Sequence, residues 1–374
     1  MVTGRSFDAA IVGAGIVGAA CARALADAGL KVAVCEQTEV IGGGATAAGM
    51  GHLAVMDDSD AQFALTSYSQ KLWRELAPHL PLEAEYLPCG SLWVAADDEE
   101  FQEVERKYGF YSNRGVPVEI LDAKQLTEAE PNLRDGLRGG LLMPSDSVCY
   151  PPVCAKYLIE SSAKIELFLR TKAVRVTDFG IETAHGSALS AGLTVLATGT
   201  AIAQLVPDVE VRPRKGHLLI TDRYPGFLRH QLIELGYLKS AHSTTSDSVA
   251  FNAQPRVTGQ ILLGSSRQYG TDEAHIDTHI LRRMLQRGIE YMPALENMSG
   301  IRTWTGFRAA TPDKLPLIGP YTGCKNVYLA TGHEGLGIST SLATARLLAD
   351  SILGRESAIS RDPYAPDRRY AVHA

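Results

Sequence analysis

A glycine-rich segment near the start of the chain, Gly13–Gly18 (GAGIVG), constrains the fold more than any other feature of the sequence. It follows a short apolar run, Ala9–Val12, which is typical of a buried parallel strand. Apolar residues at helical spacing follow over residues 16–28, and a second apolar run, Lys31–Cys35, comes next. Strand, helix and strand in this order predict a βαβ unit.

The glycines of this segment match the needs of a dinucleotide. Gly13 makes the tight turn after the strand, Gly15 lets the backbone approach a pyrophosphate, and Gly18 lets the helix pack closely on the strand. The positive end of the helix dipole favours an anion there. Glu36, at the end of the second strand, is placed to accept hydrogen bonds from both ribose hydroxyls. The alternative is a glycine-rich turn with a surface glutamate, but the flanking elements favour dinucleotide binding.

Two further segments indicate FAD rather than a nicotinamide cofactor. A run of small residues, Ile41–Met50, would let the backbone wrap an extended ligand. Near the other end, the apolar run Asn326–Ala330 leads through Thr331–Ile338 into a long helix. The N-terminus of that helix would face the flavin N1/O2 edge, where reduction places negative charge. A second GxGxxG unit for NAD(P) is absent from the sequence.

The middle of the chain has a different character. Three strands separated by turn-rich segments predict an antiparallel sheet, namely His217–Thr221, Val249–Gln254 and Gln260–Ser266. Other expected elements are an amphipathic helix over 59–79, strands over 91–96 and 192–197, a charged, exposed helix over 99–108 and a polar surface tail over 361–374.

Bulk properties limit the partners of the chain. A length of 374 residues suits two domains, and a net charge of −6 argues against nucleic acid or an anionic membrane as the main partner. The six cysteines include no CxxC pair and no His/Cys cluster with zinc spacing, so no metal site is expected, and a reducing compartment fits best. No secretory signal and no apolar run of about 18 residues is visible, which predicts a cytoplasmic protein that does not span a membrane.

Together these segments resemble the D-amino-acid oxidase and glycine oxidase family of flavoproteins. The matching elements are GAGIVG with Glu36, GGGATAAGM, LATG (196–199), GFRAATPDKLPLIGP (306–320) and NVYLATGHEGLGI. Three stretches are most similar to bacterial D-hydroxyproline dehydrogenases: GMGHLAVMDDSDAQFALTSYSQKLW, NAQPRVTGQILLGSSRQYG and TGHEGLGI. The resemblance implies an α/β fold, in which a Rossmann-type FAD-binding domain carries an inserted α+β substrate domain built on an antiparallel sheet.

The resemblance also implies that the two domains interleave along the chain. The FAD-binding domain is expected over 1–80, 137–210 and 307–374, and the substrate domain over 81–136 and 211–306. The residues expected to bind FAD are Gly13, Gly15, Ile16, Val17, Glu36, Gln37, Gly44, Ala45, Thr46, Gly49, Met50, Val174, Thr198, Gly199, Gly332, His333, Gly335, Leu336, Gly337 and Ile338.

Three residues are candidates for the substrate chemistry. The resemblance implies that Arg308 clamps the substrate carboxylate, for which a guanidinium is suited; an ion pair with Asp313 is the alternative. Asn252 falls where glycine oxidase has a tyrosine, and its amide could meet a ring hydroxyl or simply face solvent. His52 lies in a motif near the flavin and is either a base or a structural or flavin contact.

The implied reaction is hydride transfer from the α-carbon of a small amino acid to flavin N5. The expected substrate is cis-4-hydroxy-D-proline, or D-proline, which would become the pyrroline carboxylate. Gly306 stands where monomeric sarcosine oxidase attaches its flavin to a cysteine, so FAD is expected to be non-covalent. No counterpart of the oxygen-activating lysine of those oxidases is evident in residues 249–269. An acceptor other than oxygen, a quinone or a protein, is therefore expected.

Other functions remain open at this point. The chain could be a glycine or sarcosine oxidase. It could also be an FAD subunit of a multi-subunit amino-acid dehydrogenase, and an oligomer is possible. A flavin monooxygenase is a third, but such enzymes carry Asp-Gly after the late strand, where this chain has Ala197-Thr198-Gly199.

Overall fold

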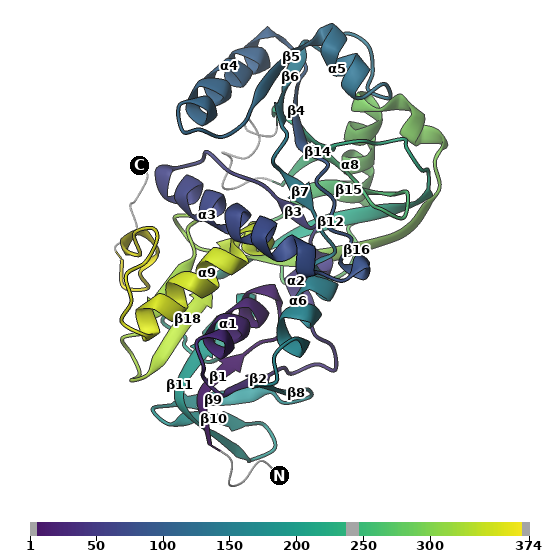
Figure 1. Ribbon diagram of the computed structural model, residues 1–374. Helices are drawn as coiled ribbons and strands as arrows, with labels where there is room; N and C mark the ends of the chain where they lie inside the picture. Colours follow the sequence, from purple (N-terminus) through teal and green to yellow (C-terminus); the bar gives the residue numbers. More distant parts are fainter. Residues whose placement is uncertain (1–5, 237–246, 369–374) are drawn as a thin grey trace.

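The computed structural model describes residues 6–236 and 247–368. Two large sheets lie at opposite ends of the molecule, with helices between them (Figure 1). This arrangement confirms the α/β fold with an antiparallel second sheet that the sequence predicts.

The first sheet has eight strands and a parallel centre. Its main path runs β17-β18-β11-β1-β2-β8, and β9 and β10 attach to β11 as an antiparallel extension. The apolar runs form its central strands because both faces of a parallel sheet are covered. The strands are β1 (Ser6–Val12), β2 (Val32–Cys35), β8 (Ile165–Phe168), β9 (Ala173–Thr177), β10 (Gly180–Thr183), β11 (Ala188–Leu196), β17 (Leu317–Pro320) and β18 (Val327–Thr331).

Four helices pack beside this sheet and build the largest core. They are α1 (Ile16–Asp27), α3 (Asp60–Leu76), α6 (Pro151–Glu160) and α9 (Gly337–Ile352). Leu25 of α1, Leu65 of α3 and Leu348 of α9 are fully buried in one hydrophobic cluster. Helix α3 begins after Ser59, whose hydroxyl accepts a hydrogen bond from Gln62 N at 3.1 Å.

The second sheet has nine strands in the order β19-β16-β12-β15-β14-β13-β4-β6-β5. Most neighbours in it are antiparallel, whereas β13 and β4 run parallel. The strands are β4 (Ser91–Ala95), β5 (Glu119–Asp122), β6 (Gly139–Met143), β12 (Arg212–Arg223), β13 (Gln231–Glu234), β14 (Ser248–Pro255), β15 (Gln260–Arg267), β16 (Gly300–Ala310) and β19 (His333–Glu334).

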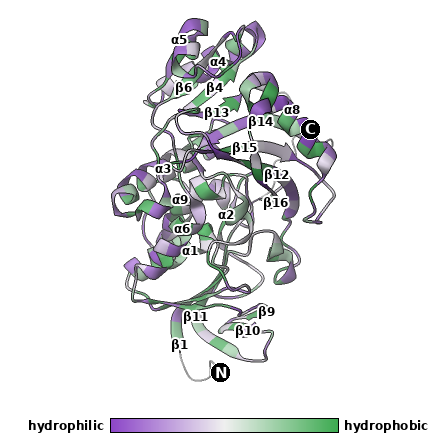
Figure 2. Ribbon diagram, turned by 90° about the vertical axis from the view of Figure 1, so that its right-hand side faces the viewer, coloured by the Kyte–Doolittle hydropathy of each residue, from purple (hydrophilic) through white to green (hydrophobic). Residues whose placement is uncertain are grey.

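Shorter elements complete the fold. Helix α8 (Thr278–Tyr291) covers β14 and β15, and the hydropathy view shows both hydrophobic and hydrophilic residues along it, as expected for a half-buried helix (Figure 2). The remaining elements are α2 (Gly44–Ala48), α4 (Asp98–Ser112), α5 (Ala123–Ala129), the two-stranded sheet of β3 (His52–Leu53) and β7 (Ser147–Val148), and the 3-10 turns 77–79, 82–84, 199–204, 293–297 and 362–364.

Two local expectations are wrong. The charged helix α4 is not simply exposed, because Val104, Lys107 and Tyr111 form a buried stripe along it. The segment after residue 361 does not lie loosely on the surface within its described part, 361–368: Tyr364 is 1% exposed, and its hydroxyl donates to Ala61 O at 2.6 Å. Its last described residue, Arg368, is held by Asp313.

The interleaved domain division remains a prediction. Strand β6 and the end of β16 pair within the nine-stranded sheet, although the expected boundaries at 136/137 and 306/307 place them in the FAD-binding parts. Among the helices of residues 6–236 and 247–368, none is long and apolar enough to cross a membrane.

Candidate active site

A cavity of about 580 Å³ lies between the two sheets. Its walls come from the loops after β1, β2, β11 and β18 and from one face of the nine-stranded sheet. Ligands of open α/β sheets bind at the carboxyl ends of the strands, and this volume is ordinary for a small-molecule site.

The predicted glycine motif forms one end of the cavity. Gly13 has φ +106°, and a Cβ there would lie 2.5 Å from Ala197 O; a Cβ on Gly18 would overlap the Gly13 carbonyl. A Cβ on Gly15 would meet only Thr46 Oγ1, at 3.2 Å. The packing of the protein therefore requires the outer two glycines, whereas Gly15 borders open space in the cavity, as the approach of a pyrophosphate requires.

Glu36 lies in the wall of the same end of the cavity, and its carboxylate is fixed by local hydrogen bonds. Its Oε2 accepts from Ala14 N at 3.0 Å, and its Oε1 accepts from Thr38 N and Thr38 Oγ1, both at 2.9 Å. A carboxylate has about four acceptor positions, so it can also accept from the hydroxyls of a ribose.

All but one of the predicted FAD-binding residues line this cavity. The exception is Val174, whose side chain is 48% exposed on β9, while its neighbour Ala173 lines the cavity. Successive side chains of a strand point to opposite faces, so the side chain of Val174 points away from the face on which Ala173 lies.

The small-residue run after Glu36 is not extended throughout. Residues Gly44–Ala48 form the short helix α2, and Thr46 Oγ1 accepts a hydrogen bond from Ile16 N at 2.9 Å. Across the cavity, the buried Thr198 Oγ1 has no hydrogen-bond partner within the described residues. The glycine motif, the Glu36 carboxylate and the Thr198 hydroxyl, which has no hydrogen-bond partner in the described structure, fit an extended dinucleotide.

Helix α9 begins beside the cavity, as predicted. Gly335, Leu336 and Gly337 line the cavity at its N-terminus. His333 is buried against this helix, with Nε2 at 3.0 Å from Thr344 Oγ1, and burial lowers its pKa to about 3. With so low a pKa, His333 stays neutral at neutral pH and adds no positive charge beside the N-terminus of α9. It is also too weak a base to be a candidate for proton transfer.

Arg308 extends from β16 across the sheet. Its Nη1 donates to Ser266 O at 3.0 Å, two strands away on β15. The intervening strand β12 carries Gly216, where a Cβ would lie 2.5 Å from Arg308 Nη1. On the other side, a Cβ on Gly335 would lie 3.3 Å from Arg308 Nε. The guanidinium thus occupies a slot between two glycines.

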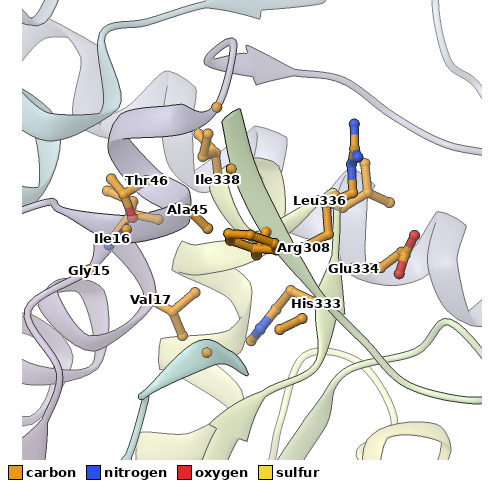
Figure 3. Close-up of a pocket in the computed structure, with 18 of the residues that line it drawn as sticks. Gly15, Ile16, Val17, Ala45, Thr46, Arg308, His333, Glu334, Leu336 and Ile338 are labelled. Atoms are coloured by element: carbon orange, nitrogen blue, oxygen red, sulfur yellow. Dashed lines mark hydrogen bonds between the residues drawn. The ribbon is translucent and has the colours of Figure 1, made fainter. Parts of the chain in front are cut away.

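No carboxylate neutralises Arg308 within the described residues. Asp313, the alternative partner, pairs instead with Arg368 at 2.7 Å, and the nearby Arg214 pairs with Glu334. Burial, and secondarily the charge of Arg214, lowers the pKa of Arg308 to about 9, which leaves it protonated at neutral pH. Arg308 is partly buried and lines the cavity, and a cation in such a place without an anion is suited to an anionic ligand. Figure 3 shows Arg308 and Glu334 across the cavity from Gly15 and Thr46.

The other two predicted substrate residues also line the cavity. Asn252 is 9% exposed, and its Nδ2 donates to Ser265 Oγ at 3.2 Å, so it does not face solvent. His52 Nε2 lies 2.6 Å from Ser91 Oγ and 3.8 Å from the buried carboxylate of Asp146. His52 is therefore held by its neighbours while one side borders the cavity.

Several lining residues were missed in the sequence. Lys107 is 1% exposed, pairs with Asp57 and lies 4.5 Å from the centre of the Trp93 ring. The spacing of Val104, Lys107 and Tyr111 along α4 was the available signal for its burial. Gln231 on β13 also lines the cavity, and nothing in the local sequence marked it.

Denaturation with acid should release all of the flavin. At Gly306 a Cβ would already overlap Ala48, and the one described cysteine that lines the cavity is Cys35, next to Glu36 at the glycine-motif end. Burial raises the pKa of Cys35 to about 12, so it is not a nucleophilic thiolate. The absorbance of the acid supernatant and pellet checks this; a yellow pellet would contradict it.

The glycine motif, Glu36 and the cavity at the ends of the parallel strands are typical of a dinucleotide-binding protein. The chain belongs to the DAO family of FAD-dependent oxidoreductases, whose family model matches residues 8–351. It is therefore FAD dependent. Within the described residues, no group of three or more His, Cys, Asp or Glu side chains could hold a metal ion.

The relatives agree with this assignment over nearly the whole chain. A glycine oxidase of Pseudomonas aeruginosa is 29% identical over 96% of this chain and 98% of its own length. The hydrogen cyanide synthase subunit HcnC of the same species is 27% identical over 92% of each chain. The crystal structure of glycine oxidase from Geobacillus kaustophilus, 25% identical, superposes with a TM-score of 0.88 over 98% of this chain and 100% of that one. Oxidation of an amine or amino acid is the activity class consistent with these relatives.

Proposed function

We propose that this enzyme oxidises the C–N bond of a small D-amino acid, with cis-4-hydroxy-D-proline, or D-proline, converted to the pyrroline carboxylate. The observation that carries the proposal is Arg308, a partly buried guanidinium that lines the cavity and has no carboxylate partner in the described structure. An amino acid brings such a carboxylate, and two parallel hydrogen bonds to it fix the orientation of the α-carbon.

FAD would be held by the glycine motif and Glu36, and the other predicted FAD-binding residues that line the cavity would surround it. Bound FAD supplies the acceptor for the hydride that leaves the α-carbon. Arg308 would hold the carboxylate, and Asn252, on the same sheet, would meet a ring substituent. His52, hydrogen bonded to Ser91, would border the amine end, where a proton must leave nitrogen as the imine forms. Trp93 and Ile233 supply apolar wall that excludes water.

A dye-coupled screen of D- and L-amino acids tests this proposal. We expect the highest kcat/KM for a D-proline and formation of the cyclic imine, which o-aminobenzaldehyde detects. Turnover of glycine and sarcosine, but not of either D-proline, would keep the family and discard this substrate.

The electron acceptor should not be oxygen. The wall formed by β14 and β15 carries no lysine in the described residues 247–269, and the buried Lys107 on α4 is engaged by Asp57. Reduction of an artificial dye or quinone should therefore be much faster than formation of hydrogen peroxide in air. Peroxide formed at the rate of dye reduction would contradict this prediction.

A second candidate is an FAD subunit of a larger dehydrogenase. It is favoured by the similarity to HcnC, which is itself a subunit of another enzyme. Flavin bleaching by substrate in the isolated chain, at a rate sufficient for turnover, would argue for an enzyme that acts alone.

A further inference from the structure

The wall of the cavity contains a buried hydrogen-bond acceptor that the site described so far does not use. Gln231 on β13 is 1% exposed, and its Nε2 donates to Leu232 O at 3.3 Å. This contact identifies the Nε2 end of the amide, because the flipped amide would place Oε1 against the Leu232 carbonyl oxygen, and the two oxygens would repel each other. The other end, Oε1, is buried without a hydrogen-bond partner in the described structure. A sheet that buries such an atom loses stability unless a ligand satisfies it.

Gln231 belongs to the same wall as Asn252. The register of the sheet places Ile233 opposite Asn252 on one side and opposite Trp93 on the other. Residues i and i+2 of a strand share a face, so Gln231 and Ile233 face the cavity together. All four side chains line it.

Each of the two amides donates one hydrogen bond and leaves its oxygen without a hydrogen bond within the described residues. Asn252 uses its Nδ2 on Ser265 Oγ, and no hydrogen bond reaches its Oδ1 within the described residues. Arg308, toward the opposite edge of the sheet, presents only donors. The wall therefore suits a ligand with an acceptor group, the carboxylate, at one end and an O–H donor at the other.

From this polarity we propose that Gln231 determines specificity by accepting a hydrogen bond from a hydroxyl on the side chain or ring of the substrate. The proposal rests on the proposed function, since it assumes a substrate carboxylate on Arg308. It extends that function by requiring a hydroxylated amino acid, with Gln231 and Asn252 as neighbouring acceptors.

The ratio of kcat/KM for cis-4-hydroxy-D-proline to that for D-proline tests the proposal. The wild type should favour the hydroxylated ring by about tenfold or more, because removing a substrate hydroxyl leaves buried polar groups unpaired. Gln231→Met, which keeps the length of the side chain without the amide, should bring the ratio close to one by slowing only the hydroxylated substrate. Gln231→Asn, which retracts the oxygen, should lower the ratio in the same direction.

Gln268, the residue after the end of β15, provides a matched control. It is 6% exposed and its Oε1 is also without a partner in the described structure, but it does not line the cavity. Gln268→Met should leave the ratio unchanged.

The outcomes separate this proposal from the proposed function. If the wild type oxidises neither D-proline, the proposed function fails. If it oxidises both equally well, or if the Gln231 variants keep the wild-type ratio, Gln231 does not read a hydroxyl. An equal loss for both substrates would assign Gln231 to the amine and overturn the proposal.

Discussion

Replacement of Arg308 by alanine should lower kcat/KM for the best D-amino acid by about two to three decades while leaving the FAD content unchanged. Truncating one partner of a buried charge pair leaves the other charge unmatched, at a cost of about 2–5 kcal/mol. Each 1.4 kcal/mol corresponds to about one decade. Arg308→Lys should recover only part, because an ammonium cannot make two parallel bonds to a carboxylate. Steady-state kinetics with a dye acceptor measures this.

Gly216 offers an independent check on the same group. A Cβ there would lie 2.5 Å from Arg308 Nη1 and 3.0 Å from Nη2, so Gly216→Ala must displace the guanidinium from its slot. The variant should therefore reproduce much of the loss of Arg308→Ala with the arginine still present. Gly226→Ala is a control for the method, since a Cβ there meets nothing within 4 Å; its φ of +76° predicts some loss of stability but none of kcat/KM. Wild-type kinetics in both Arg308→Ala and Gly216→Ala would move the carboxylate site elsewhere.

Replacement of Gly15 by valine should abolish FAD binding without unfolding the protein. Within the protein a Cβ at Gly15 meets only Thr46 Oγ1, at 3.2 Å, so the added side chain would project into the space for the pyrophosphate. We expect purified protein that lacks the yellow colour and has a native circular dichroism spectrum.

Two further variants of the same motif should have different effects from Gly15→Val. Gly18→Val should fail to fold, because its side chain would overlap the Gly13 carbonyl. Glu36→Ala should bind FAD more weakly by about 1–3 kcal/mol, through the loss of two charge-assisted hydrogen bonds. Fully yellow Gly15→Val and Glu36→Ala proteins with wild-type FAD affinity would show that the dinucleotide lies elsewhere.

The parts of this site that could be predicted are those with a local signal. Gly13, Gly15 and Gly18 lie within six residues of one another, and together with the flanking strand and helix their spacing predicts a phosphate-binding turn. Arg308 was found through a motif of the family rather than through its own environment. Its slot could not be foreseen, because it joins Gly216 and Gly335, which are far apart in the sequence.

The residues that were missed depend on strand register and on contacts between distant segments. Gln231 reaches the cavity because β13 pairs with β14 and β4, which no periodicity in a four-residue strand reveals. Lys107 was assigned to solvent because a charged helix is usually exposed. Its burial depends on contacts with Asp57 and Trp93, which lie outside its own helix. Val174 stays a prediction, although its side chain is exposed and the cavity is lined by its neighbour Ala173.

Anaerobic mixing of the purified enzyme with cis-4-hydroxy-D-proline tests the central claim most directly. The account predicts loss of the oxidised-flavin absorbance at a rate that saturates with substrate concentration, with no bleaching by the L-enantiomer. In Arg308→Ala the same bleaching should require far more substrate. A flavin that stays oxidised with both D-prolines but bleaches with glycine or sarcosine would contradict the proposed substrate, and bleaching by no amino acid at all would contradict the proposed reaction.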